Sequence, residues 1–287
     1  IIKKASASGI LYLCISGGEP LLNFNNIIKL LRCAQNEKML VGLSTNGSMY
    51  GGISDTQALK LKEFDNITIN VSINGAKSET HDHITGLRNS FNNAIKTLRT
   101  LSINKIPASC GPVALNNNIS ELIDLAKITY SMGISSFSVD YVKPNGNAIR
   151  NGFWKIAPSP KRYLKFIKNL NDWYKTIDNS KFYISLDQEY SIFYGDRNIN
   201  IKDQVFLRKN KYCSAGNQAI ELTADGEVYP CVTTFGLEEF RLGNIKNHSI
   251  SDLWFSDKLN KIRERNIKMI EDKICHECEM GDICSGG

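Results

Sequence analysis

Short apolar runs alternate with helical patterns along the first two thirds of this sequence. The apolar runs lie at residues 11–15, 39–43, 67–73, 106–115 and 137–142. Apolar residues recur at helical spacing over residues 23–33, 55–64, 91–101, 119–132 and 158–177. Strands that alternate with helices pair in parallel, because each parallel connection needs a crossover long enough to hold a helix. The sequence therefore predicts an α/β domain built from strand–loop–helix units.

A polar or glycine-rich tetrapeptide lies at the end of four of these expected strands. The four tetrapeptides are Gly17 to Pro20, Ser44 to Gly47, Ser72 to Gly75 and Pro144 to Asn147. Each alone is typical of a turn, since Gly, Asn and Pro favour turns. In an α/β barrel, however, the loops after the strands form the active face. Together they predict a ligand site at one end of a barrel.

The strand–helix alternation stops near residue 195, where we place a domain boundary. Beyond it, Asp225-Gly226 separates two short apolar runs, residues 219–222 and 228–231, which predicts a β-hairpin. Short helices are expected over residues 250–254 and 259–262. The chain therefore has two domains.

Five of the eight cysteines lie in the last quarter of the chain: Cys213, Cys231, Cys275, Cys278 and Cys284. No signal peptide is visible, and disulfide frameworks suit small secreted domains, so we expect metal ligation in a reducing cytoplasm. Thiolates two residues apart, as in Cys275 and Cys278, can hold one metal or cluster. Spacing alone favours structural zinc and an iron–sulfur cluster about equally.

Composition excludes two classes of partner. No stretch reaches the roughly 18 consecutive apolar residues of a membrane-spanning helix. The net charge of +6 comes from lysines scattered along the amphipathic segments. Such a distribution is typical of solvated surface, so we expect neither a membrane nor a nucleic-acid partner.

The cysteine order resembles the SPASM domain of radical SAM (S-adenosylmethionine) enzymes that modify peptides. The resembling features are Cys213, Gly226 and Cys231, then Cys275, Cys278 and Cys284, with the linker segments 242–245 and 250–254. The resemblance implies that Cys213 and Cys231 serve one auxiliary 4Fe–4S cluster and that the other three cysteines serve a second. Both ligand sets are incomplete, and further cysteines are expected after Gly287.

The N-terminal part resembles the radical SAM core. Ser16 to Pro20 is similar to the family's Gly-Gly-Glu-Pro motif, and Ser72 to Gly75 is similar to its Ser-x-Asp-Gly motif. Glycines let a ligand approach the backbone closely. The resemblance implies S-adenosylmethionine contacts from Gly17, Gly18, Glu19, Pro20, Ser44, Asn46, Ser72, Asn74 and Val142.

The resemblance implies a fold of two parts. Residues 1–195 would form a partial (β/α)6 TIM-like barrel of the radical SAM type, and residues 196–287 a small Cys-rich α+β SPASM domain, both truncated. The Cys-x-x-x-Cys-x-x-Cys motif for the catalytic cluster is absent, and we expect it upstream of Ile1.

Two further departures from the family concern the cofactor. Asn74 replaces the usual Asp, and Thr85 replaces an Arg in a segment that resembles His-Asp-x-x-Arg-Gly. Arg88 is a candidate to replace the lost contact with the cofactor carboxylate. His81 and His83, in the same segment, are expected on a surface loop.

The implied function is reductive cleavage of S-adenosylmethionine to a 5′-deoxyadenosyl radical, which modifies a peptide or protein substrate. An electron donor such as flavodoxin or ferredoxin is implied. Val232 follows Cys231 where sulfatase maturases tend to have Asp, so peptide maturation is favoured. The alternatives are a degenerate relative that only binds a peptide or partner, and a zinc-stabilised barrel enzyme of another kind.

Overall fold

The computed structural model describes residues 1–186 and 214–271, with side chains described as far as Glu264. Contacts divide the chain into two compact units, residues 9–187 and residues 188–287, and most of helix α1 (Ile2–Ala7) groups with the second. The boundary predicted near residue 195 lies outside the described residues.

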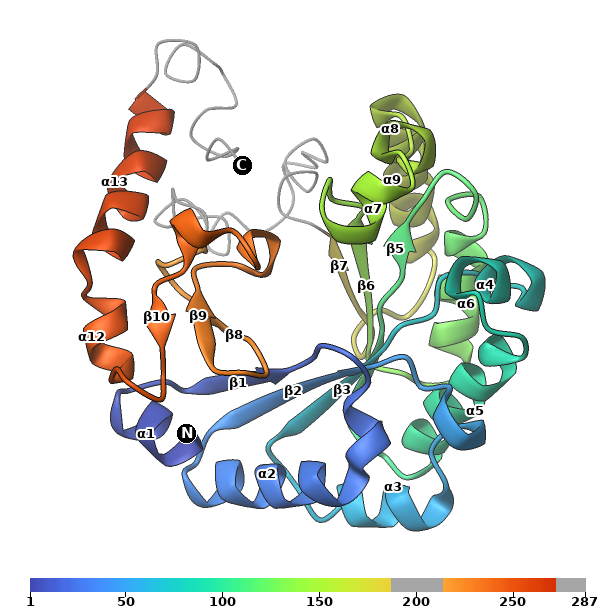
Figure 1. Cartoon of the computed structure of the whole chain (residues 1–287). Coiled ribbons are helices and arrows are strands. Elements are labelled where there is room, and N and C mark those ends of the chain that lie inside the picture. The colour runs from blue at the N-terminus through green and yellow to red at the C-terminus, as the bar shows by residue number, and fades with distance from the viewer. Residues whose placement is uncertain (187–213, 272–287) are drawn as a thin grey trace. The chain divides into compact units, whose positions relative to one another are not determined.

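The first unit is a parallel sheet with helices on one face (Figure 1). Its strands run in the order β1-β2-β3-β4-β6-β5, and β7 also pairs with β6. Every pairing in this sheet is parallel. The strands are β1 (Tyr12–Ile15), β2 (Leu40–Thr45), β3 (Ile67–Val71), β4 (Ala108–Cys110), β5 (Val113–Ala114), β6 (Ser136–Tyr141) and β7 (Tyr183–Leu186). The observed fold is the expected partial α/β barrel.

Helices connect the successive strands except β4 and β5, which only residues 111 and 112 separate, and several helices begin at clear sequence signals. Ser54 and Gln57 form a capping box at the start of α3, and Ser159 caps α9 with Pro160 in its first turn. The helices are α2 (Phe24–Asn36), α3 (Asp55–Leu61), α4 (Ser78–Thr85), α5 (Ser90–Ile103), α6 (Leu122–Ser131), α7 (Gly146–Arg150), α8 (Phe153–Ile156) and α9 (Pro160–Tyr174). Short 3₁₀ turns, η1 (Pro20–Asn23) and η2 (Met49–Gly51), follow β1 and β2.

The two faces of the sheet differ in chemistry. One face is aliphatic and buried: Leu43 is 1% exposed, and Ile69 and Val71 are fully buried. Alternate residues point to the opposite face. There the central strands carry small polar side chains, at Thr68, Asn70, Ser109, Ser136, Ser138 and Asp140. Parallel strands are usually hydrophobic on both faces, so the polar face suits a solvated ligand space.

The expected strands and long helices are present, but the segment after β3 differs. Residues 78–85, expected as a surface loop around His81 and His83, form α4, in which His81 is 1% exposed and His83 is exposed. The expectation was wrong for His81 because the helix has few apolar residues, so it shows no apolar stripe in the sequence. Strand β7 and the short helices α1, α7 and α8 were also not predicted.

The second unit contains a three-stranded antiparallel sheet. Strands β8 (Glu221–Leu222) and β9 (Glu227–Tyr229) form the hairpin predicted at Asp225-Gly226, and β10 (Gly243–Asn244) pairs with β9. Turns η4 (Val232–Thr234) and η5 (Glu238–Phe240) follow β9. Helix α12 (Ile250–Trp254) was expected, and α13 (Asp257–Glu271) is longer than predicted. Within the described parts of both units, no helix is long and apolar enough to cross a membrane.

Candidate functional site

The carboxylate of Glu19 joins the loop after β1 to the end of β2. Its Oε1 accepts hydrogen bonds from the Leu21 amide at 3.0 Å and from Thr45 Oγ1 at 2.6 Å. Its Oε2 accepts one from the Asn46 amide at 2.7 Å. Ser72 then donates its amide to Thr45 O at 2.9 Å. The first three tetrapeptides therefore meet at one edge of the sheet.

Gly17 and Gly18 form an exposed loop beside this carboxylate. Their φ angles are +79° and +52°, which side chains rarely adopt, so glycine is required by the backbone conformation. A Cβ added at either residue would meet no atom within 4 Å. The loop therefore leaves open space in which a ligand can approach the backbone.

Asn74 links the end of β3 to β5. Its Oδ1 accepts a hydrogen bond from the Val113 amide at 2.9 Å. Fully buried Asn118 donates through Nδ2 to both Asn74 O and Val113 O, at 2.9 and 2.8 Å. A carboxylate oxygen at position 74 would accept the same backbone bond. The replacement of Asp by Asn thus keeps this brace and adds an amide N–H₂ donor.

Helix α4 is fixed beside the same strand end by two of its side chains. His81 Nδ1 accepts a hydrogen bond from the Asn74 amide at 2.9 Å, so this nitrogen carries no proton. Burial lowers the pKa of His81, although the negative charge of Asp82 acts to raise it. Asp82 accepts hydrogen bonds from the start of α5, at Asn89 N, Ser90 Oγ and Phe91 N. Burial tends to raise the pKa of Asp82, but these bonds lower it overall.

The remaining residues expected at the cofactor lie at or near the ends of strands β2, β3 and β6. Ser44 is the next-to-last residue of β2 and is half-buried, and Asn46 Oδ1 accepts bonds from the Ser48 amide and hydroxyl. Val142, 7% exposed, directly follows β6, and Pro144 to Asn147 lead into α7. Arg88 is exposed and lines an open hollow with residues of α4. The replacement of the missing Arg by Arg88 stays a prediction.

These groups fit the amino-acid end of S-adenosylmethionine. Oε2 of Glu19 accepts one hydrogen bond from the protein, which leaves a lone pair for an ammonium donor. The amide N–H₂ of Asn74 is a donor suited to a carboxylate. The open glycine loop adds backbone groups next to Glu19.

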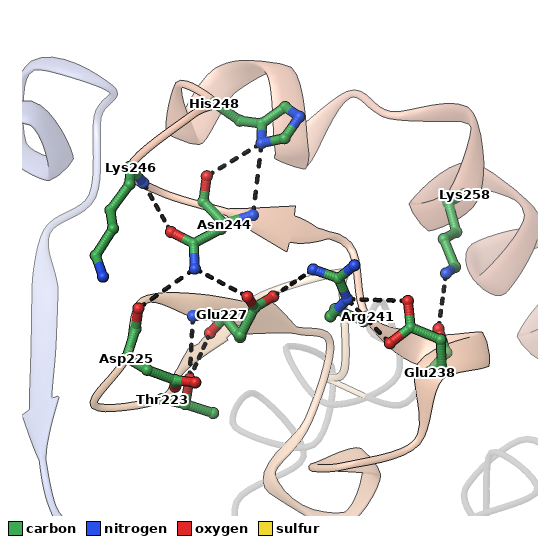
Figure 2. Close-up of polar contacts among 9 residues, drawn as sticks. All are labelled: Thr223, Asp225, Glu227, Glu238, Arg241, Asn244, Lys246, His248 and Lys258. Carbon is green, nitrogen blue, oxygen red and sulfur yellow. Dashed lines mark hydrogen bonds and ion pairs between the residues drawn. The ribbon is translucent and has the colours of Figure 1, made fainter.

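In the second unit, hydrogen bonds around Glu227 hold the hairpin and its neighbouring strand (Figure 2). Arg241 Nη1 donates to Glu227 Oε2 at 2.7 Å, and Asn244 Nδ2 donates to Glu227 Oε1 at 2.9 Å. These bonds lower the pKa of Glu227, and the bond from Arg241 has the largest effect. Arg241 Nε also pairs with Glu238, at 3.0 Å. Gly226, with φ +94°, forms the turn between the strands.

Of the five expected cluster cysteines, Cys231 is the one that the structure describes. It lies two residues after the end of β9, beyond Pro230, and is half-buried. Cys213, Cys275, Cys278 and Cys284 lie outside the described residues. In the described ranges, no three His, Cys, Asp or Glu residues gather as a metal site.

Sequence reasoning missed the positioning contacts of two residues in the site. Thr45, 3% exposed, bonds Glu19, and Asn118 holds Asn74. Thr45 belongs to the tetrapeptide Ser44 to Gly47, so its position at a strand end could be predicted from the sequence. Asn118 lies 44 residues from Asn74, and only the fold brings them together.

Two protein-family models match this chain. The radical SAM superfamily matches residues 1–129, and SPASM, an iron–sulfur cluster-binding domain, matches residues 213–279. Among curated proteins, the AdoMet-dependent heme synthase of Methanosarcina barkeri is 23% identical over 99% of this chain and 79% of its own length. The subtilosin biosynthesis protein AlbA of Bacillus subtilis is 25% identical over 97% of this chain and 57% of its own length.

A similar fold is found among solved structures. Streptococcus suis SuiB bound to S-adenosylmethionine superposes with a TM-score of 0.78 at 20% identity. The match covers all of this chain and 64% of the SuiB chain. The chain thus spans less than two thirds of SuiB and of AlbA, but more than three quarters of the heme synthase.

Proposed function

Because this chain belongs to the radical SAM superfamily and carries a SPASM iron–sulfur cluster-binding domain, we propose that it cleaves S-adenosylmethionine reductively and modifies a peptide or protein substrate. When bound, S-adenosylmethionine would take one electron from a 4Fe–4S cluster and split into methionine and a 5′-deoxyadenosyl radical, which would take a hydrogen atom from the substrate. The observation that carries the proposal is the junction of the first three tetrapeptides around Glu19.

The residues at this junction bind and orient the cofactor. Glu19 accepts a hydrogen bond from its ammonium group while remaining fixed by Thr45 and Asn46. Ser72 and Asn74 lie at the neighbouring strand end and contact its carboxylate and ribose. Gly17, Gly18, Pro20, Ser44 and Val142 complete the expected contacts.

A peptide is the substrate class that we propose. SuiB has been solved with its precursor peptide SuiA, and AlbA serves the biosynthesis of the bacteriocin subtilosin. The polar face of the sheet, with half-buried Asn70, Ser136 and Ser138, offers hydrogen-bonding groups to a peptide backbone. The heme synthase relative makes a tetrapyrrole substrate the competing possibility.

The remaining assignments are part of the same proposal. Residues 1–195 form the radical SAM core, and residues 196–287 form the SPASM domain. Cys213 and Cys231 ligate one auxiliary 4Fe–4S cluster, and Cys275, Cys278 and Cys284 ligate a second. Thiolate ligation suits a reducing cytoplasm, where a flavodoxin or ferredoxin supplies electrons.

Formation of 5′-deoxyadenosine by the full-length protein tests this proposal. The protein is reconstituted anaerobically with iron and sulfide and then given dithionite and S-adenosylmethionine. We expect 5′-deoxyadenosine to form and to be lost after iron chelation. A protein that binds iron but forms no 5′-deoxyadenosine would be a binding module. A colourless protein that contains zinc and no sulfide would be a zinc-stabilised barrel enzyme.

A further inference from the structure

The hydroxyl of Thr233 lies against the sulfur of Cys231. Thr233 Oγ1 donates a hydrogen bond to Cys231 Sγ across 3.2 Å. The neighbouring Thr234 also bonds Cys231, but at a different atom: its Oγ1 and its amide both donate to Cys231 O, at 2.7 and 3.0 Å. Two adjacent threonines therefore contact the same cysteine, one at the sulfur and one at the carbonyl oxygen.

The turn that carries these threonines is held at both ends. Before it, Val228 and Tyr229 of β9 are 1% and 6% exposed. After it, the Phe235 ring packs on the Tyr229 ring, with centroids 5.3 Å apart. The bonds from Thr234 to Cys231 O close the 3₁₀ turn between these points. The turn thus fixes the backbone of Thr233 next to Cys231, within reach of the sulfur.

A hydrogen bond to a ligating sulfur changes the reduction potential of an iron–sulfur cluster. When the cluster gains one electron, no bond breaks and no proton moves, but negative charge increases on the cluster and its thiolates. A donor O–H stabilises that added charge, because hydrogen bonds to charged acceptors are stronger than those to neutral ones. The reduced form gains more from the bond than the oxidised form.

We propose that Thr233 is a positioning residue whose hydroxyl raises the reduction potential of the auxiliary cluster held by Cys231. This inference rests on the proposed function, in which Cys231 is a cluster ligand. Thr233 itself does not ligate iron. It acts through the sulfur, by making the cluster easier to reduce with a low-potential electron donor.

The midpoint potential of this cluster tests the inference directly. In the reconstituted full-length protein, the cluster is reduced stepwise with dithionite and followed by its electron paramagnetic resonance signal. We expect Thr233→Val to shift the midpoint potential downward and Thr233→Ser, which keeps a hydroxyl, to hold it near that of the unmodified protein. Thr234→Val is the matched control, because its hydroxyl bonds the carbonyl oxygen, and its potential should change less than that of Thr233→Val.

Iron content separates the failure of this inference from the failure of the proposed function. Loss of one cluster in Cys231→Ala, with full iron in Thr233→Val, is the expected result. If Thr233→Val loses iron, Thr233→Ala at this exposed position takes its place in the measurement. An unchanged potential in an iron-replete variant would overturn the role of Thr233 alone. Full iron in Cys231→Ala would overturn both the ligand assignment and this inference.

Discussion

The carboxylate of Glu19 has a structural role in the fold, besides the role proposed for it in binding the cofactor. Three donors from its own chain converge on its two oxygens, and these bonds fix the loop after β1 against the end of β2. A carboxylate held in this way presents its remaining lone pair in one direction. The same residue thus joins two strand ends and, in the proposed site, would orient a charge for the cofactor.

Replacing Glu19 by Gln should weaken both roles. A glutamine has one acceptor oxygen, so its amide nitrogen must face at least one of the donors Leu21 N, Thr45 Oγ1 and Asn46 N. We expect the free energy of unfolding in urea to fall by about 1–3 kcal/mol, the usual cost of a lost buried partner. Binding of S-adenosylmethionine should weaken as well. The control Glu79→Gln, at an exposed position of α4, should change stability by less than about 0.5 kcal/mol.

His81 should make the stability of the fold depend on pH. Burial lowers its pKa in the folded state, while the unfolded chain titrates near 6.5. Below about pH 6.5 the unfolded state therefore binds a proton that the folded state does not, and stability falls until pH reaches the folded-state pKa. Urea unfolding from pH 8 to 5 should show this loss, with a slope of at most about 1.4 kcal/mol per pH unit.

Two variants on the same helix isolate this effect. His81→Gln keeps an acceptor for the Asn74 amide and should flatten the slope between pH 6.5 and 5. His83→Gln, at an exposed position two residues on, should keep the slope of the unmodified protein. An equal flattening in both variants would argue against His81 as its source.

Among the elements, helix α4 depends on a close approach to the end of β3. A Cβ at Gly75 would lie 2.9 Å from Thr80 Cβ and 3.1 Å from the His81 backbone nitrogen. Because backbone is involved, Gly75→Ala should displace the helix and cost about 1–3 kcal/mol in urea unfolding. Gly86→Asn at the other end of α4 is the control, since Asn tolerates the left-handed conformation of that residue. Equal stability losses in the two variants would contradict this packing argument.

The sequence predicts elements well where one face is apolar and poorly where polar contacts hold them. Strands β2, β3 and β6 and helices α2 and α5 follow from their periodic apolar residues. Helix α4 is polar and is anchored by His81 and Asp82, so its pattern could not reveal it. The tetrapeptides identify the strand ends of the site, but the bonds from Asn118 and Thr233 depend on tertiary structure and local turn geometry.

For the whole molecule, the two units differ in how they are stabilised. The first has a continuous aliphatic core between sheet and helices, with Leu43, Ile69 and Leu98 at most 1% exposed. The described part of the second buries far fewer apolar side chains: Ala5, Val228, Tyr229, Leu253 and Leu259. Small domains with little core often depend on a metal or disulfides. We therefore expect the proposed clusters to contribute much of the stability of the second unit.

Removing iron from the full-length protein should then loosen one unit and spare the other, because cluster binding is coupled to folding of the Cys-rich part. By hydrogen exchange, the amides of Val228 and Tyr229 in β9 should exchange at least roughly tenfold faster after chelation, equivalent to about 1.4 kcal/mol. The amides of Ile69 and Val71 in β3 should keep their protection. Cys231→Ala should reproduce the loss in β9 without a chelator. Equal acceleration in β3 and β9 would show that the units unfold together, and no change in β9 would show that its hairpin is stable without iron.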